Sequence, residues 1–454
     1  MSSAPAVAAN RNQNLSSAVR EAEERYIAAN PESQRLAQLA SQRLPGGNTR
    51  TTVHFSPFPL YMATGKGSRL IDVDGHSYAD FINEYTAGVF GHSNAVIGEA
   101  VRQALGGGIN LGAPTRHERL LAEEIQRRFP AMELLRFCNS GTEANLLALA
   151  TACAVTGKPG VMIFDGAYHG SIVYFAHGAS PLNMQFDWIS STFNDLERMQ
   201  TDIAANADRL AAVIVEPMQG GAGALPADPA FLQGVRAACD ANEVLLVLDE
   251  VMTSRLDSGG LQSIMGVKPD LMTLGKCVGG GLTIGAFGGR ADIMARFDPS
   301  RPDAYPHGGT FNNNVLAMAA GHAALTRVLT ADAQARMNAL GDRLRTRLAE
   351  LARKHDVPMQ VTGLGSIFGI HFHAGPIRNI GDLDRGERGR EALISDIKKL
   401  FHLDMLAAGQ YISRRVMGNL SVETSEADAD ALCQAIEEFL VSRGALVRDA
   451  FHQA

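Results

Sequence analysis

The stretch from Leu134 to Gly288 constrains the fold most, because short apolar runs alternate there with glycine-containing turns and helical segments. The runs cover residues 134–138, 161–164, 211–215, 244–248, 271–274 and 284–288. Continuous apolar runs of this length are typical of strands buried on both faces of a sheet. Their alternation with helices predicts an α/β domain with a mostly parallel sheet that helices cover on both sides.

Lys276 stands just after the run 271–274 and is followed by three glycines, Gly279 to Gly281. Ligands of parallel sheets bind at the carboxyl ends of the strands. Burial at such a place lowers the pKa of a lysine, and a neutral amine is a nucleophile. Glycines leave room for a flat ligand to approach. By itself, the pattern is more typical of a solvated loop lysine.

Ser140-Gly141-Thr142 joins the first run to a helical segment at 144–155. Free backbone N–H groups and the helix dipole converge at such a junction, and the two hydroxyls add donors, so the turn is a candidate phosphate site. It lacks the lysine of the G-x-x-x-x-G-K-S/T motif, which excludes a nucleotide P-loop. The alternative is a plain helix cap with Glu143 in the first turn.

Three further strand ends carry polar or aromatic residues. Asp249 could hold a proton on a heteroaromatic nitrogen, and the alternative is a capping or ion-paired aspartate. Tyr168, followed by His169, could stack on a flat ring or simply pack. We interpret Glu216 as a structural residue. A phosphate site, a stacking ring, an acid and the Lys276 amine together predict pyridoxal phosphate (PLP).

The flanking sequence predicts a second, smaller α+β domain. Residues 16–44 indicate two helices with a break at Asn30-Pro31, and residues 60–81 indicate short strands with a hairpin turn at Asp74-Gly75. Residues 315–355 predict a long helical stretch with a break near Thr330. We therefore expect an N-terminal segment that packs with the small domain (1–70), a large PLP-binding domain (71–314) and a C-terminal small domain (315–454).

The composition excludes several classes of protein. A net charge of −7 argues against nucleic acid as the main partner. Five cysteines without a C-x-x-C pair indicate a reducing compartment, without a disulfide framework or a zinc site. No apolar stretch approaches the roughly 18–20 residues of a membrane helix. We expect a cytoplasmic protein with no membrane partner, in which Met1 to Leu15 is a disordered leader, a transit peptide being the alternative.

In order and spacing, the motifs resemble class III (ω-type) aminotransferases of PLP fold type I, from about residue 35 to the end. The stretches that carry the resemblance are Asn139 to Asn145, Tyr168-His169-Gly170, Glu216-Pro217, Leu248 to Val251, Leu274-Gly275-Lys276 and Gly309-Thr310-Phe311. Further stretches resemble the glutamate-1-semialdehyde aminomutase-like branch and, within it, bacterial β-phenylalanine aminotransferases: Pro45 to Arg50, Pro57 to Leu60, Glu84 to Val89, Asp249 to Arg255 and Gly309 to Asn314. The resemblance implies a seven-stranded sheet in the large domain.

The resemblance also implies how the cofactor is held. Lys276 would carry PLP as a Schiff base and move the substrate proton, and Asp249 would pair with the pyridine nitrogen. Tyr168 would stack on the ring. The phosphate would be bound by Ser140, Gly141 and Thr142 and, from the neighbouring subunit, by Thr310. A homodimer would then be the smallest active unit.

For the substrates, the resemblance implies a small-molecule amino donor and a keto-acid acceptor. Arg50 would bind the carboxylate of a β-amino acid, and Arg415, or its neighbour Arg414, would bind the α-carboxylate of 2-oxoglutarate or an α-amino acid. The sequence does not fix the side-chain pocket, for which Tyr85, Val89 and the region 252–255 are candidate lining residues. The implied reaction is ping-pong transamination from a β-phenylalanine-like β-amino acid to 2-oxoglutarate or pyruvate.

Other functions stay open at this point. An aminomutase, a racemase or another amine or amino acid transaminase would use the same scaffold. A nicotinamide-dependent dehydrogenase is disfavoured, because Gly279 to Gly281 is not a G-x-G-x-x-G turn between a strand and a helix. A binding protein without catalysis is disfavoured because Lys276 and Asp249 are both present.

Overall fold

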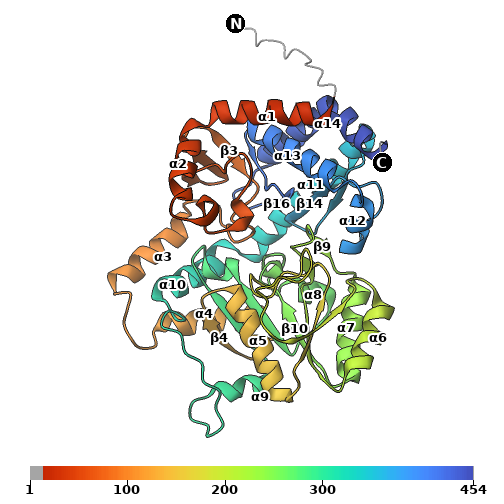
Figure 1. The fold of residues 1–454 in the computed structure, drawn as a ribbon. Coiled ribbons are helices and arrows are strands. Elements are labelled where there is room, and N and C mark those ends of the chain that lie inside the picture. Colours follow the sequence, from red (N-terminus) through yellow and green to blue (C-terminus); the bar gives the residue numbers. More distant parts are fainter. Residues whose placement is uncertain (1–13, 453–454) are drawn as a thin grey trace.

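A seven-stranded sheet forms the centre of the larger, lower part of the molecule (Figure 1) in the computed structural model, which describes residues 14–452. Its strand order is β4-β12-β11-β10-β7-β5-β6. The strands are β4 (Leu134–Cys138), β5 (Gly160–Phe164), β6 (Asp187–Ser191), β7 (Leu210–Val215), β10 (Leu245–Asp249), β11 (Leu271–Gly275) and β12 (Gly285–Gly289). Only β12 pairs antiparallel with its neighbours. The mostly parallel sheet is therefore confirmed.

Helices cover both faces of this sheet, as predicted. Along β5, Val161 and Ile163 pack in one apolar cluster with α5 (Gly141–Thr156), whereas Met162 and Phe164 pack in another with α6 (Leu196–Asn206) and α7 (Pro229–Ala241). This alternation follows from the two-residue period of a strand. The other helices of this part are α3 (Ala95–Gly106), α4 (Arg116–Arg128), α8 (Leu261–Met265), α9 (Ala291–Met294) and α10 (Val315–Ala323).

The upper part of the molecule joins segments from both ends of the chain (Figure 1). Its helices are α1 (Leu15–Ala29), α2 (Pro31–Ser41), α11 (Ala331–Lys354), α12 (Ile380–Glu387), α13 (Glu391–Ala407) and α14 (Glu426–His452). One sheet holds β1 (Met62–Lys66), β2 (Arg69–Asp72), β3 (Ser77–Asp80) and β15 (Gln410–Tyr411), and another holds β13 (Gln360–Thr362), β14 (Ile367–His371) and β16 (Met417–Asn419). The predicted breaks at Asn30-Pro31 and near Thr330 are present.

The pairing of β15 with β3 is parallel and brings residues 410–411 beside residues 79–80. The expected boundary between residues 70 and 71 falls inside β2, which pairs with both β1 and β3. The division into 1–70, 71–314 and 315–454 stays a prediction. Most of the predicted leader, Met1 to Leu15, lies outside the described residues. Within 14–452, none of the helices has both the length and the apolar character that crossing a membrane requires.

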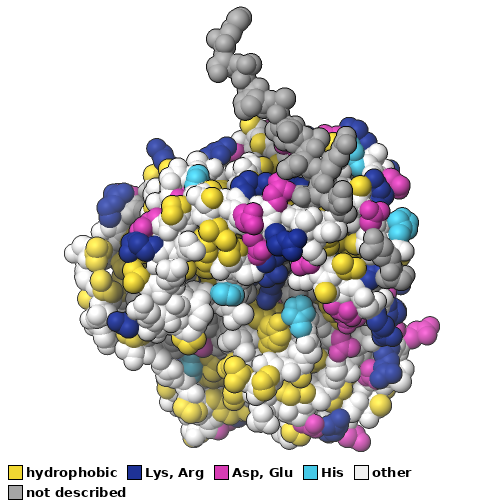
Figure 2. All heavy atoms as spheres, turned by 45° about the horizontal axis from the view of Figure 1, so that its top comes forward, with side chains coloured by type: hydrophobic (Ala, Val, Ile, Leu, Met, Phe, Trp, Pro, Cys, Tyr) yellow, Lys and Arg dark blue, Asp and Glu magenta, His cyan; other side chains and the backbone are white. Residues whose placement is uncertain are grey.

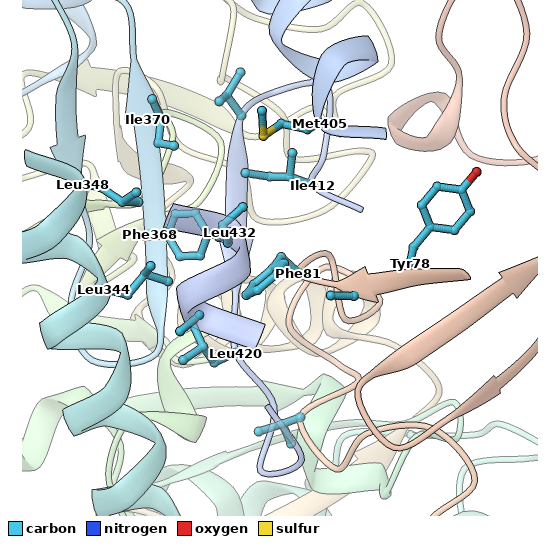
Figure 3. Packing of buried hydrophobic residues seen from close by; sticks show 14 of the residues in the cluster. Tyr78, Phe81, Leu344, Leu348, Phe368, Ile370, Met405, Ile412, Leu420 and Leu432 are labelled. Carbon is cyan, nitrogen blue, oxygen red and sulfur yellow. The ribbon is translucent and has the colours of Figure 1, made fainter. Parts of the chain in front are cut away.

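The core of the upper part fixes the segment that follows β3. Phe81 is completely buried, and its ring centroid lies 6.4 Å from that of Phe368 on β14. Leu344 and Leu348 of α11 and Leu420 pack in the same cluster (Figure 3). The chain therefore leaves β3 from a rigid position before it reaches residues 83–86.

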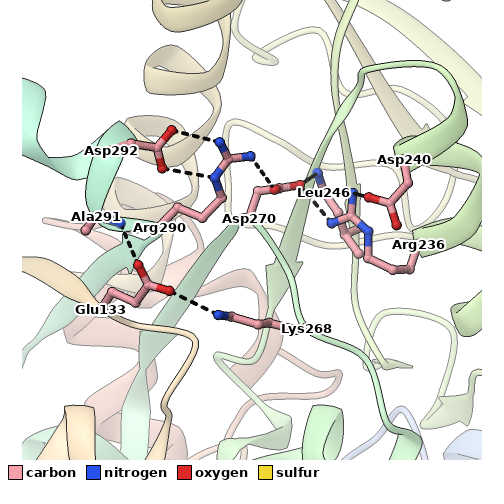
Figure 4. A network of polar contacts seen from close by, with 9 residues as sticks. All are labelled: Glu133, Arg236, Asp240, Leu246, Lys268, Asp270, Arg290, Ala291 and Asp292. Carbon is pink, nitrogen blue, oxygen red and sulfur yellow. Dashed lines mark hydrogen bonds and ion pairs between the residues drawn. The ribbon is translucent and has the colours of Figure 1, made fainter.

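A polar network fixes the opposite end of the central strands (Figure 4). Asp270, directly before β11, accepts the N–H of Leu246 at 2.8 Å and contacts Arg236 at 2.7 Å and Arg290 at 2.9 Å. The hydrogen bond from the Leu246 N–H and the two guanidinium groups hold the pKa of the Asp270 carboxyl below its usual value, against the effect of burial. This network anchors β11 at the end opposite to Lys276.

Candidate active site

A cavity of about 800 Å³ lies at the carboxyl ends of the central strands, between the two parts of the molecule. The lower part contributes Lys276, Asp249, Tyr168, Glu216 and the turn Ser140-Gly141-Thr142. The upper part contributes Arg50, Tyr85, Arg414 and Arg415. Figure 2 shows Lys and Arg side chains gathered near the middle of the face that this view presents. The strand ends named from the sequence therefore meet at one place.

Lys276 directly follows β11, as predicted, and has a positive φ of 51°. Its Nζ donates a hydrogen bond to Oγ1 of Thr86 at 3.1 Å. Burial lowers the pKa of the amine, while the charges of Asp249 and Glu216 act in the opposite direction. An amine with a lowered pKa is a better nucleophile near neutral pH.

The three glycines after Lys276 do not all open space for a ligand, contrary to the prediction. Gly281 lines the cavity. A Cβ on Gly279 would lie 2.6 Å from a side-chain carbon of Ile284, and one on Gly280 would lie 2.6 Å from the carbonyl oxygen of Ala320. Gly279 and Gly280 therefore allow the turn to pack against its neighbours.

Asp249 ends β10 and is held by three donors. Its Oδ2 accepts from Nδ2 of Asn145 at 2.7 Å and lies 2.8 Å from Nδ1 of His169, and its Oδ1 accepts the N–H of Val251 at 3.0 Å. Asn145 is itself fixed by Thr273, whose hydroxyl donates to it at 2.6 Å. The sequence reasoning missed Asn145 and Thr273. A signal existed, because Asn145 lies one turn after Gly141 on the helix that begins at the phosphate turn.

Ser140 caps α5, and its Oγ accepts the N–H of Glu143 at 3.1 Å. The N–H groups of Gly141 and Thr142 have no acceptor among residues 14–452. They stand at the positive end of a helix of 16 residues. A Cβ on Gly141 would lie 2.8 Å from Val251, so only glycine fits this turn. The turn is thus a helix cap and, at the same time, a candidate phosphate site.

Glu216 and Tyr168 form one wall of the cavity. The Glu216 carboxylate accepts the N–H of Tyr168 at 2.9 Å and that of Gly220 at 3.0 Å, which fits the structural role predicted for it. Burial raises the pKa of Glu216 to about 7, with an opposing effect from His169 and a smaller raising effect from Asp249. The Tyr168 ring is 40% exposed and faces the cavity, where a flat ligand could stack on it.

These residues fit PLP by their own chemistry. Two N–H groups without acceptors and a helix N-terminus suit a phosphate, and a fixed carboxylate suits a protonated ring nitrogen. An aromatic face and an amine with a lowered pKa stand on the same cavity. The cavity therefore has a group for each part of the cofactor.

The candidate carboxylate-binding residues lie on the upper side of the cavity. Arg50 forms an ion pair with Glu84, and its guanidinium lies 5.8 Å from the ring centroid of Tyr85. Burial raises the pKa of Tyr85, and the nearby charge of Arg415 opposes that effect. The charge of Arg414 acts instead on His402, whose pKa burial lowers to about 4. Both Arg414 and Arg415 line the cavity, so the structure leaves the choice between them open.

Val89 and Arg255 do not line the cavity, contrary to expectation. Val89 is fully buried in the apolar core, because the chain turns inward after Thr86. Arg255 is also fully buried, whereas Met252 does line the cavity. Thr310 is exposed and outside the cavity of its own chain. Its predicted contact with a neighbouring subunit stays a prediction.

The sequence reasoning also missed the outer wall of the cavity, which α12 and α13 build. The wall residues are Ile380, Leu383, Asp384, Glu391, Ile394, Ser395 and Lys398, together with His371. On α13 they follow helical spacing, at positions i, i+3, i+4 and i+7. The face mixes charged, polar and apolar side chains, so its periodicity gives no amphipathic signal.

Comparison with known proteins places this geometry in a family. The model of the family "Aminotransferase class-III" matches residues 51–440. The beta-phenylalanine transaminase of Variovorax paradoxus is 44% identical over 433 residues, covering 95% of this chain and 98% of that protein. The crystal structure of the β-phenylalanine aminotransferase from that organism has a TM-score of 0.92, at 44% identity, and the match covers 95% of this chain and 99% of that one.

Two further relatives have similar coverage. An uncharacterised aminotransferase of Schizosaccharomyces pombe is 46% identical over 437 residues, 96% of this chain and 98% of that protein. A glutamate-1-semialdehyde 2,1-aminomutase from an Anaeromyxobacter strain is 35% identical over 425 residues, 89% of this chain and 97% of that protein. The fold and the similarity over nearly the whole length agree: the chain belongs to the class III aminotransferases.

Proposed function

We propose that this aminotransferase moves the amino group of a β-amino acid of the β-phenylalanine type to an α-keto acid such as 2-oxoglutarate or pyruvate. The observation that carries the proposal is the presence of Arg50 and Arg415 on the cavity that holds the Lys276 amine. The relative from Variovorax paradoxus, a beta-phenylalanine transaminase, supports the substrate class.

Bound PLP supplies an electron sink for the carbon that carries the amino group. In this proposal, Lys276 would remove the proton from that carbon and deliver it to the aldehyde carbon of the cofactor during the same half-reaction. Asp249 keeps the ring nitrogen protonated, and Asn145 and His169 hold the carboxylate in place. The N–H groups of Gly141 and Thr142 bind the phosphate, and Tyr168 covers one face of the ring.

Two arginines are required because the two substrates present their carboxylates differently. In a β-amino acid, one more carbon separates the carboxylate from the reacting carbon than in an α-keto acid. Each guanidinium can bind a carboxylate through two parallel hydrogen bonds. We assign Arg50 to the β-amino acid and Arg415 to the keto acid. Tyr85 lines the same cavity, and the guanidinium of Arg50 lies 5.8 Å from its ring centroid.

We also propose that the enzyme is a homodimer in which Thr310 contributes to the phosphate site of the partner. Thr310 lies in an exposed stretch, and the neighbouring Phe311 is 60% exposed. An exposed aromatic residue beside a polar loop is typical of a protein interface. A cytoplasmic location stays a prediction.

The absorbance of the bound cofactor during each half-reaction tests the proposed activity. Purified holoenzyme would be mixed with 3-amino-3-phenylpropanoate, and then with 2-oxoglutarate or pyruvate. The proposal expects the band of the lysine-bound cofactor to disappear with the β-amino acid and to return with the keto acid. A band that is lost and does not return would show that neither 2-oxoglutarate nor pyruvate is the amino acceptor. An unchanged band would refute the β-amino acid and favour an aminomutase, which converts its substrate without an external keto acid.

A further inference from the structure

Four consecutive residues before Ala87 have left-handed backbone conformations. The φ angles of Asn83, Glu84, Tyr85 and Thr86 are 42°, 52°, 51° and 78°. For residues with a Cβ, such conformations are unfavourable by about 1–2 kcal/mol each. A run of four therefore persists only because the surrounding structure determines it.

This left-handed segment carries groups of the active site. Glu84 and Tyr85 line the cavity, and the Thr86 hydroxyl accepts the hydrogen bond from Nζ of Lys276 at 3.1 Å. The turn closes when the N–H of Gly88 donates to the carbonyl of Asn83 at 2.8 Å. A Cβ on Gly88 would lie 2.9 Å from the same carbonyl, so the turn requires glycine there.

Arg255 holds the far side of the segment. Its Nη1 donates to Oδ1 of Asn419 at 2.6 Å and to the carbonyl of Thr86 at 3.3 Å, and its Nη2 donates to the carbonyl of Leu420. The guanidinium is completely buried, and no carboxylate contacts it in the part of the chain that the structure describes. Burial lowers its pKa to about 10. A buried cation without an anionic partner is costly, so the oxygen atoms that accept its hydrogen bonds must offset that cost.

Asn419 joins the same arrangement from the other side. Its Nδ2 donates to the carbonyl of Ile82 at 2.7 Å, and its own carbonyl accepts from Nδ2 of Asn83 at 2.7 Å. Arg255 and Asn419 thus hold the two ends of the left-handed segment, at Thr86 and at Asn83. These hydrogen bonds hold the backbone of the segment in one conformation.

We propose that Arg255 is a positioning residue for the catalytic lysine: by holding the carbonyl of Thr86, it places the Thr86 hydroxyl where it binds and orients Nζ of Lys276. The inference deepens the proposed function, since it concerns the amine that the reaction uses. It also explains why Arg255 lies in the core and not on the cavity.

The proposal has a measurable consequence in the proton affinity of Lys276. A hydroxyl that accepts from Nζ stabilises the ammonium form more than the neutral amine. Losing this hydrogen bond should therefore lower the pKa of Lys276 further. Arg255→Lys keeps the positive charge but replaces a planar fork of donors with a single ammonium, so it loosens the carbonyl of Thr86 without removing the charge.

The test measures how fast acetic anhydride labels Lys276 at different pH values in the full-length, cofactor-free chain, by mass spectrometry of the Lys276 peptide. Only the neutral amine reacts. Thr86→Val should move the labelling curve to lower pH by about one unit, which is a tenfold change in proton affinity. Thr86→Ser, which keeps the hydroxyl, should stay near the wild type.

Arg255→Lys should shift the curve in the same direction as Thr86→Val. The double variant should match Thr86→Val alone, because Arg255 acts through Thr86 and the effects of coupled residues do not add. Additive shifts, or an Arg255→Lys curve that coincides with the wild type, would overturn the proposal. If Arg255→Lys does not fold, Asn419→Ser loosens the same left-handed segment. A labelling curve for Asn419→Ser that coincides with the wild type would likewise overturn the proposal.

Arg128→Lys is the matched control. Arg128 is a second buried arginine, and its Nη2 donates to the carbonyls of Leu325 and Leu329. It does not contact Thr86 or Lys276, so its replacement should lower the unfolding temperature and leave the labelling curve unchanged. The labelling needs no substrate, which separates its failure from a failure of the proposed activity in the half-reaction assay.

Discussion

Nδ1 of His169 lies 2.8 Å from Oδ2 of Asp249, and both side chains are buried. Because Asn145 donates to the same oxygen, the carboxylate has one orientation. Its other oxygen accepts only the N–H of Val251 within residues 14–452. The orientation of the Asp249 carboxylate therefore depends on residues from α5, from the turn after β5 and from the turn that follows β10.

Asp249→Asn and His169→Leu should slow the β-amino acid half-reaction to different extents. Asp249→Asn removes the charge that keeps the ring nitrogen protonated and should slow the β-amino acid half-reaction by about 10²–10³-fold. His169→Leu leaves the charge but removes one hydrogen bond, and should cost about tenfold. Stopped-flow absorbance measures both rates, with the unfolding temperature as a control for folding. Equal losses would show that His169 does more than orient Asp249.

Glu216 should make the stability of the folded state depend on pH. Burial raises its pKa to about 7 from the ordinary value of 4.5 for a glutamate, so the folded chain binds the proton more tightly than the unfolded chain does. The stabilisation is complete below pH 4.5 and is lost as the pH rises through 7. A shift of this size corresponds to roughly 3 kcal/mol.

The comparison with Glu216→Gln isolates this contribution. Calorimetry at pH 5 and pH 8 should show that the wild type loses stability relative to the variant as the pH rises. A difference between the two proteins that stays constant over this range would contradict the raised pKa of Glu216.

Arg50 and Arg415 should affect different half-reactions. Arg50→Gln should lower kcat/KM for the β-amino acid by about 10–100-fold, since a hydrogen bond to a charged group contributes about 1.5–3 kcal/mol. It should leave the keto-acid half-reaction nearly unchanged. Arg415→Gln should show the reverse pattern, with Arg414→Gln as the control. Equal loss in both half-reactions for Arg50→Gln would remove its assignment to the β-amino acid.

Thr310→Val should weaken cofactor binding although Thr310 does not line the cavity of its own chain. The loss of one hydrogen bond to phosphate should raise the dissociation constant of PLP about tenfold. Fluorescence titration of the cofactor-free protein measures it, and light scattering should find two chains per particle. A monomer with full activity would refute the shared site.

The strand ends were predictable because a parallel sheet brings them to one edge whatever the loops do. Lys276, Asp249 and the Ser140-Gly141-Thr142 turn follow apolar runs directly, so their positions follow from chain order. By contrast, β6 was missed, because Asp187-Trp188-Ile189-Ser190-Ser191 mixes polar and apolar residues at the edge of the sheet. An edge strand has one hydrogen-bonded neighbour and is less buried than a central strand, so it requires fewer apolar residues.

The positions of Val89 and Arg255 could not be predicted for a different physical reason. Four residues with side chains in left-handed conformations give no local signal, because such conformations are unfavourable for each of them separately. The burial of Arg255 depends on carbonyls of Thr86 and Leu420 that come from distant parts of the chain. Val89 and the region around residues 252–255 were therefore expected to line the cavity.

The bond between Asn83 and Asn419 joins residues 336 positions apart, and this separation matters while the protein is being made. Ribosomes add about 5–20 residues per second, so Asn419 emerges roughly 15–70 seconds after Asn83. In the later part of that interval, once Lys276 has been added, the nascent chain has its lysine and its aspartate but lacks the partner that shapes the segment carrying Thr86. The site therefore matures last, and translation must be almost complete before the reactive amine is in its final environment.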